Sequence, residues 1–161
     1  MANASWPRWV FASVANHLHD AADTADVTFV VEHLDDRSET WKNAAVRAEA
    51  TIAGPHIKQL SADVWRVVVD VLIIVATHRQ TDTNAYNHLD AVGEFVYALD
   101  QCIEVKEYAP GNVVSPDSVG LLTPTRDRNK SITADHLKPG HADQIFTTMI
   151  QAQFTGQFSE G

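Results

Sequence analysis

The feature of this 161-residue chain that most constrains its fold is the stretch 44–100, which combines two strand patterns with one helix pattern. In residues 44–52 one face is apolar and the other is mostly polar. The apolar positions are Ala44, Val46, Ala48, Ala50 and Ile52. Alternation with a period of two predicts a strand with one buried and one wet face. The Gly54-Pro55 pair then predicts the end of this strand.

Residues 64–75 predict a strand of another kind. Beyond Val67 they are apolar on both faces, except at Asp70. Such a strand is either central in its sheet or turns its second face toward another subunit. Because a buried carboxylate is costly unless it is paired, three environments are open for Asp70. It faces an arginine or water, it lies in a subunit interface, or it serves as a catalytic acid.

A helix is predicted after a polar turn at residues 77–84. Its apolar residues recur at steps of four and three, the spacing of a helix face that packs on a core. They are Ala85, Leu89, Val92, Val96 and Leu99. Asp82 or Thr83 is expected to cap the first amides of this helix. Strand alternation resumes at residues 103–106.

The flanking segments add shorter elements. Ser5 and Pro7 predict the start of an N-terminal helix. Short strands are predicted at 27–31, 119–122 and 131–133, and loops at 32–43 and 109–118. The first of these loops is acidic and carries Glu32, Asp35, Asp36 and Glu39.

The C-terminal segment 145–158 predicts a long strand whose apolar residues share one parity. These include Phe146, Ile150, Phe154 and Phe158. Strands usually have ~3–10 residues, so this one either bends, for example at Gly156, or reaches past its own domain. It is then either an internal edge strand with a frayed end or a strand that pairs with a neighbour's sheet. In the second case, deletion of residues 154–161 weakens assembly more than folding.

Together these patterns predict an α+β fold. A mixed, mainly antiparallel β-sheet is packed by an N-terminal helix and a central helix and ends in a long C-terminal strand. The length fits one domain, residues 1–161. Residues 1–43 hold the first helix, a strand and the acidic loop, 44–108 form the core, and 109–161 hold loops and the last strand.

Composition narrows the function. The net charge of −9 argues against a protein that grips nucleic acid by neutralising phosphates. The single cysteine, Cys102, excludes an internal disulfide. No apolar run reaches the ~18–20 residues of a membrane span, and the N-terminus lacks the pattern of a signal peptide. We therefore expect synthesis in the cytoplasm and no membrane partner.

The sequence contains no catalytic or cofactor motif. The eight histidines show no metal-ligand spacing, and there is no nucleophile elbow or phosphate-binding glycine loop. We therefore predict no catalytic residue, metal or cofactor. A small α+β enzyme with a scattered active site remains the main alternative from another class.

Three segments resemble the tail terminator and neck proteins of tailed bacteriophages. They are Gly54-Pro55-His56-Ile57-Lys58-Gln59-Leu60, the strand from Trp65 to Val75, and the run from Thr81 to Gly93. The similarity covers residues 44–108 and extends weakly to residues 145–158. The N-terminal 40 residues and residues 109–118 lie outside it.

The resemblance implies a structural role without enzymatic activity. Members of the family form rings, usually of six copies, which cap the tail tube and join it to the head. The implied partners are further copies of the chain, the head connector or stopper protein, the tail tube and sheath protein, and genomic DNA that passes without specific binding. The implied place is the virion, at the head–tail junction. A head-completion or stopper protein and a minor tail-tube subunit are the alternatives within the virion.

Within this hypothesis we assign two sets of candidate residues. The subunit interface is expected at Phe146, Ile150, Phe154, Phe158 and Asp70. The channel lining is expected at Glu32, Asp35, Asp36 and Glu39, where a ring of carboxylates would repel the DNA backbone.

Overall fold

The computed structural model describes residues 5–78, 86–109, 112–127, 130–137 and 145–159. Its helices are α1 (Trp6–Thr24), α2 (Glu39–Asn43) and α3 (Tyr86–Leu99). Its strands are β1 (Thr28–Val31), β2 (Val46–Ser61), β3 (Val64–His78), β4 (Ile103–Ala109), β5 (Asn112–Pro124), β6 (Thr133–Leu137) and β7 (Ile145–Ser159). They form one sheet in the order β1-β2-β3-β7-β5-β4, with β6 also paired to β7. Only β1 runs parallel to its neighbour. The predicted α+β fold is confirmed.

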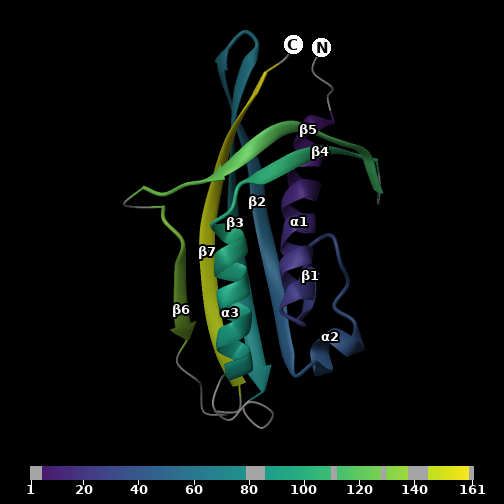
Figure 1. The fold of residues 1–161 in the computed structure, drawn as a ribbon, viewed down its shortest axis with the longest axis vertical. Coiled ribbons are helices and arrows are strands. Elements are labelled where there is room, and N and C mark those ends of the chain that lie inside the picture. The colour runs from purple at the N-terminus through teal and green to yellow at the C-terminus, as the bar shows by residue number, and fades with distance from the viewer. Residues whose placement is uncertain (1–4, 79–85, 110–111, 128–129, 138–144, 160–161) are drawn as a thin grey trace.

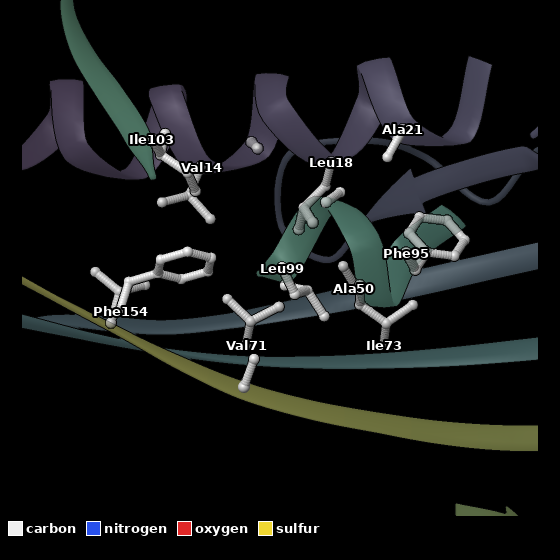
Figure 2. Packing of buried hydrophobic residues seen from close by; sticks show 14 of the residues in the cluster. Val14, Leu18, Ala21, Ala50, Val71, Ile73, Phe95, Leu99, Ile103 and Phe154 are labelled. Carbon is white, nitrogen blue, oxygen red and sulfur yellow. The ribbon is translucent and has the colours of Figure 1, made fainter. Parts of the chain in front are cut away.

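The two long helices, α1 and α3, lie side by side on one face of the sheet (Figure 1). The hydrophobic core fills the space between them and the strands. Figure 2 shows Val14 and Leu18 of α1 and Leu99 of α3 directed toward Val71 and Phe154 of the sheet. Burial of this apolar surface is the main force that stabilises the domain.

The alternation in the two central strands is confirmed. In β2, Ala48 and Ala50 are fully buried. In β3 the odd-numbered residues from Val67 to Val75 face the core, and the even-numbered ones are half-buried or, at Ile74, exposed. β3 is central, which was one of the two alternatives for this strand, with β2 on one side and β7 on the other. Its second face is therefore apolar in sequence but only partly covered within this chain.

The predicted end of the first strand at Gly54-Pro55 is wrong. β2 continues to Ser61, and its register with β3 shifts between Ala53 and His56. Gly54 has φ +115°, a conformation that glycine adopts without strain, and the following peptide bond is cis. The extra residue is absorbed as a β-bulge, where a proline is tolerated. The strand therefore bends at this point and goes on.

The predicted loop at 109–118 is also wrong in the part that the structure describes. β4 and β5 pair along it as a hairpin, with several register shifts between Val105 and Tyr108. The turn-favouring residues Ser115, Pro116, Asp117 and Ser118 lie inside β5. Cross-strand pairing with β4 keeps these residues extended, which local composition does not predict.

α3 forms where the helix pattern predicts it, but with a different buried face. Val92 and Leu99 are buried as expected, whereas Leu89 is exposed. His88 and Phe95 occupy the core positions instead. The helix is therefore rotated so that the large Phe95 ring and His88, which has buried hydrogen-bond partners, face the core instead of Leu89. Ala85 and the proposed caps Asp82 and Thr83 lie outside the described residues.

The close packing of Gly120 against Phe158 yields a first testable prediction. A Cβ atom at Gly120 would lie 2.2 Å from Phe158 Cε1. Phe158 is itself stacked on Trp6, with 5.1 Å between the ring centroids. We expect Gly120→Ala to lower the free energy of unfolding by about 1–3 kcal/mol through overpacking. Urea denaturation followed by circular dichroism measures this.

The matched control for this prediction uses the same substitution without the ring. In a Phe158→Ala background the clash is absent, so Gly120→Ala should cost much less there. Equal costs in both backgrounds would show that the Phe158 ring is not the cause.

Candidate functional site

The C-terminal strand does not lie where an interface strand would. β7 pairs with β3 along its whole length on one side, and with β6 and then β5 on the other. Ile150 and Phe154 are fully buried and Phe158 is 6% exposed within this single chain. Their assignment to a subunit interface is therefore wrong, because the helices and β5 already cover them. Phe146 is half-buried, so its assignment remains a prediction.

Asp70 lies on the sheet face opposite the helices. Its Oδ1 accepts a hydrogen bond from Gln153 Nε2 at 2.9 Å, and its Oδ2 lies 3.6 Å from His56 Nε2. The side chain is 46% exposed, so water solvates the carboxylate as well. The carboxylate therefore does not incur the free-energy cost of a buried, unpaired charge, because it is half-exposed and has polar partners. Its place in a subunit interface remains a prediction.

Of the four acids of the predicted channel lining, two accept hydrogen bonds from their own domain and two are exposed. Asp35 Oδ2 accepts hydrogen bonds from Val31 N at 2.9 Å and His19 Nε2 at 2.8 Å. Glu32 accepts one from Thr51 Oγ1 at 2.8 Å. Asp35 and Glu32 thus hold the start of the loop against its own domain. Asp36 and Glu39 are exposed, Glu39 beside Lys42 at 3.2 Å, so these two remain the candidates for a channel lining.

The rest of this loop contains a short helix that the sequence analysis missed. Ser38 Oγ caps α2 by accepting a hydrogen bond from Trp41 N. Trp41 Nε1 donates to Ala48 O at 2.9 Å, and the guanidinium groups of Arg37 and Arg47 lie over its ring. The serine followed by Glu39 is a capping signal that could have indicated α2. Trp41 therefore fastens the loop to the sheet edge.

Arg37 is held by a carboxylate of β2. Its guanidinium donates to Glu49, and this hydrogen bond, together with the charge of the carboxylate, raises the pKa of Arg37 above its ordinary value. Arg37 therefore stays charged at neutral pH. The loop around α2 is thus positioned by fixed charges as well as by Trp41.

A hydrogen-bond chain links α3 to three strands inside the domain. His88 of α3 is buried, with Nδ1 2.9 Å from Thr77 Oγ1 of β3 and Nε2 2.7 Å from Thr148 Oγ1 of β7. The Thr148 hydroxyl also lies 2.6 Å from His136 Nδ1 of β6. A hydroxyl has one hydrogen, so Thr148 donates to at most one of the two imidazoles and accepts from the other. This network fixes the position of β6 relative to the core.

Two hairpins extend beyond the core, and neither was predicted from the sequence. We define the β2–β3 arm as residues 55–67 and the β4–β5 arm as the described residues 106–109 and 112–119. In Figure 1 the β2–β3 arm extends upward past the helices and the β4–β5 arm reaches to the right, past α1. Five large apolar side chains on the arms are 43–57% exposed. They are Ile57, Leu60, Val113, Val114 and Val119.

Both arms also carry a strand edge without a partner strand among the described residues. β1 covers the outer edge of β2 only along Arg47–Ala50, so the edge from Thr51 to Ser61 has no partner strand. β5 pairs with β7 only at Leu122–Pro124, so its edge before Leu122 has none either. Open strand edges offer backbone donors and acceptors to another chain.

The outer edge of β4 is closed in a different way. Ser13 Oγ of α1 accepts a hydrogen bond from Lys106 N at 3.1 Å. Tyr108 O accepts from Trp9 Nε1 at 3.0 Å and from Arg8 Nη2 at 3.2 Å. Packing at this junction also raises the pKa of Tyr108, through burial of its ring. Side chains of α1 therefore occupy the β4 edge up to Tyr108.

Hollows are present on the surface that the described residues form. One of about 750 Å³ lies between the end of α1, α2 and the starts of β2 and α3, with Asp26 and Asp90 among its lining residues. Another of about 390 Å³ lies beside Asp70 and Lys130 on the open sheet face. Among the described residues, no three histidine, cysteine, aspartate or glutamate side chains are grouped as metal ligands. Of the helices in those ranges, none is long and apolar enough to cross a membrane.

The pairing of Asp35 yields a prediction about the acidic loop. We expect Asp35→Ala to lower the free energy of unfolding by about 1–3 kcal/mol, because Val31 N and His19 lose their acceptor. Asp36→Ala is the matched control, with an expected change within about 0.5 kcal/mol for an exposed residue. Thermal and urea denaturation of both variants measure the difference. Equal stabilities would contradict a structural role for Asp35.

Comparison with known proteins places the fold. No protein-family model and no curated protein matches the chain. Nineteen chains of solved structures do match it. One of these is similar over 96% of this chain and 97% of its own length, with a TM-score of 0.55 and 12% sequence identity. At that identity the likeness concerns the fold alone, so the arrangement of helices and strands seen here recurs over almost the full length of another protein.

Proposed function

We propose that this protein is a structural ring subunit of a phage head–tail junction, a tail terminator or neck protein. The resemblance of residues 44–108 to that family supports the identity. The observation that carries the proposal is the pair of projecting arms, each with exposed apolar side chains and an open strand edge. A chain that remained alone would leave these surfaces in water at a cost in hydrophobic free energy.

Ring closure follows from the different nature of the two arms. A contact between unlike surfaces is head-to-tail, and repeated head-to-tail contacts close into a ring when the rotation between copies fits. Six copies are the number that the family resemblance implies. Such a ring would cap the tail tube on one side and dock on the head connector or stopper protein on the other. Sheath protein would be a further neighbour in a contractile tail.

The charge of the chain supports a passive channel. Each copy carries a net charge of −9, so a ring of copies repels the phosphate backbone and lets DNA pass without adhesion. Asp36 and Glu39 are the exposed members of the acidic loop and are the ones that we place facing the channel. The protein would thus work in the virion, after synthesis in the host cytoplasm. A head-completion protein, a stopper and a minor tail-tube subunit share these requirements and are the neighbouring assignments.

Negative-stain electron microscopy of the purified protein tests this function, together with its mass measured by light scattering. We expect rings with a central channel and a mass that is an integral multiple of the subunit mass. A protein that stays monomeric up to about 1 mM, where even contacts of about 4 kcal/mol would be half-occupied, would contradict the proposal.

A further inference from the structure

The β2–β3 arm carries an unfavourable pair of like charges. Lys58 and Arg66 are direct cross-strand partners, and both are exposed. Like charges opposite each other destabilise a sheet, and neither residue has an ion-pair partner in the described part of the chain. With Asp63 as its one acid, this arm has a net charge of 2 − 1 = +1 in a chain of −9. The pair is therefore suited to carboxylates that come from another molecule.

The β4–β5 arm has the opposite charge. Glu107 and Asp117 outnumber Lys106, which gives the arm a net charge of 1 − 2 = −1. Glu107 lies directly opposite the uncharged Ser115. Neither carboxylate is in an ion pair within the described ranges. The two arms are thus electrostatically complementary.

Both arms also carry exposed apolar side chains. Ile57 and Leu60 are exposed on the basic arm, and Val113, Val114 and Val119 on the acidic arm. An apolar patch with charged residues at its border is typical of a protein–protein contact. Each arm also offers one open strand edge, from Thr51 to Ser61 in β2 and before Leu122 in β5.

We propose that the β2–β3 arm of one copy docks on the β4–β5 arm of the next copy, with Lys58 and Arg66 facing Glu107 and Asp117. The occupant is a second copy because this chain itself supplies the matching charge, apolar residues and strand edge. This inference rests on the proposed ring function, and it specifies which surfaces of neighbouring copies form the contact, here called the joint. Because the arms differ, each copy uses one arm toward each neighbour and the assembly is polar.

Charge reversal tests this joint. Lys58→Glu/Arg66→Glu makes both arms acidic, and Glu107→Lys/Asp117→Lys makes both arms basic. We expect each variant alone to associate at least about tenfold more weakly than the natural chain, because like charges then meet. An equimolar mixture of the two variants should assemble again, with the variants alternating. One chain with all four reversals should also assemble, since its arms are complementary once more.

Matched control variants distinguish loss of the contact between the arms from a general effect of the changed net charge. Lys58→Glu/Arg66→Glu changes the net charge from −9 to −9 − 4 = −13, and so does Lys42→Glu/Arg126→Glu away from the arms. Glu107→Lys/Asp117→Lys changes it to −9 + 4 = −5, and so does Asp23→Lys/Asp90→Lys on the helices. Both control variants should assemble like the natural chain. Circular dichroism confirms that every variant is folded, and sedimentation velocity measures association.

The outcomes separate this inference from the proposed function. If the natural chain forms rings and the arm variants do so equally well, the joint lies elsewhere and the ring function stands. If each variant fails alone and the mixture also fails, complementarity between these arms is wrong. If the natural chain forms no oligomer up to about 1 mM, both the ring and the joint are refuted.

Discussion

A chain that lacks residues 154–161 is expected to be unfolded under conditions in which the full chain is folded. The deletion removes Phe154 and Phe158, which are 0% and 6% exposed. Loss of a buried phenylalanine side chain costs about 3–5 kcal/mol, and the total stability of a domain is about 5–15 kcal/mol. The deletion also removes the strand partner of β3 from Val64 to Val69 and all of the β5–β7 pairing. Far-ultraviolet circular dichroism and urea titration measure the effect.

This expected result replaces the prediction made from the sequence alone, in which the deletion weakens assembly more than folding. That prediction treated the end of β7 as an interface strand, whereas the strand is central and its apolar side chains are already covered. Phe154→Ala alone should cost about 3–5 kcal/mol. Tyr97→Ala is the control, since Tyr97 is exposed on α3. A truncated chain with a sharp unfolding transition and native dichroism would contradict the central position of β7.

The second large effect is expected from His88→Leu. Leucine fits an apolar environment but leaves the buried hydroxyl of Thr77 without its imidazole partner and removes one of the two imidazole partners of Thr148. A buried polar group without a partner costs about 1–3 kcal/mol. Since Thr77 loses its partner and Thr148 keeps His136, we expect the free energy of unfolding to fall by about 1–3 kcal/mol. Thermal and chemical denaturation provide the measurement.

A double-substituted variant distinguishes this mechanism from simple misfit of the leucine. Thr77→Val removes the hydroxyl that His88→Leu leaves unpaired, so the double variant should recover part of the stability lost in the single one. Thr148 keeps His136 as a partner in every variant. Strictly additive losses in the two single variants and the double variant would show that the Thr77–His88 hydrogen bond does not stabilise the fold.

Several elements were predictable because their patterns are local. The alternation in residues 44–52 and 64–75 predicts which side chains share a face, and the structure buries those of β2 and β3 accordingly. The common parity of Ile150, Phe154 and Phe158 likewise predicts one buried face of β7. Geometry within a single strand or helix fixes these relations, so they need no knowledge of the rest of the chain.

The candidate site was less predictable, because exposure depends on what covers a face. The sequence indicates that the even-numbered residues of β7 are buried, but it does not distinguish burial by α1 and β5 from burial by a second copy. In the acidic loop, Asp35 and Asp36 are adjacent and alike, yet only Asp35 lies within reach of Val31 N and His19. The two arms were not predicted, because Gly54-Pro55 has the composition of a strand end and residues 109–118 have the composition of a loop.

The sequence by itself determined the fold class, the position of α1 and α3, and the phase of the long strands, since periodicity reflects one-dimensional order. Only the tertiary structure decided that β7 is central, that Phe95 replaces Leu89 in the core, and that two hairpins of opposite charge project from the domain. The physical reason is that the place of β7 depends on pairing between residues far apart in the chain, such as Val71 with Ala152. Burial of Phe95 and exposure of the arms likewise depend on which surfaces the rest of the domain covers. Contacts of that kind are selected by the packing of the whole domain, which no local pattern encodes.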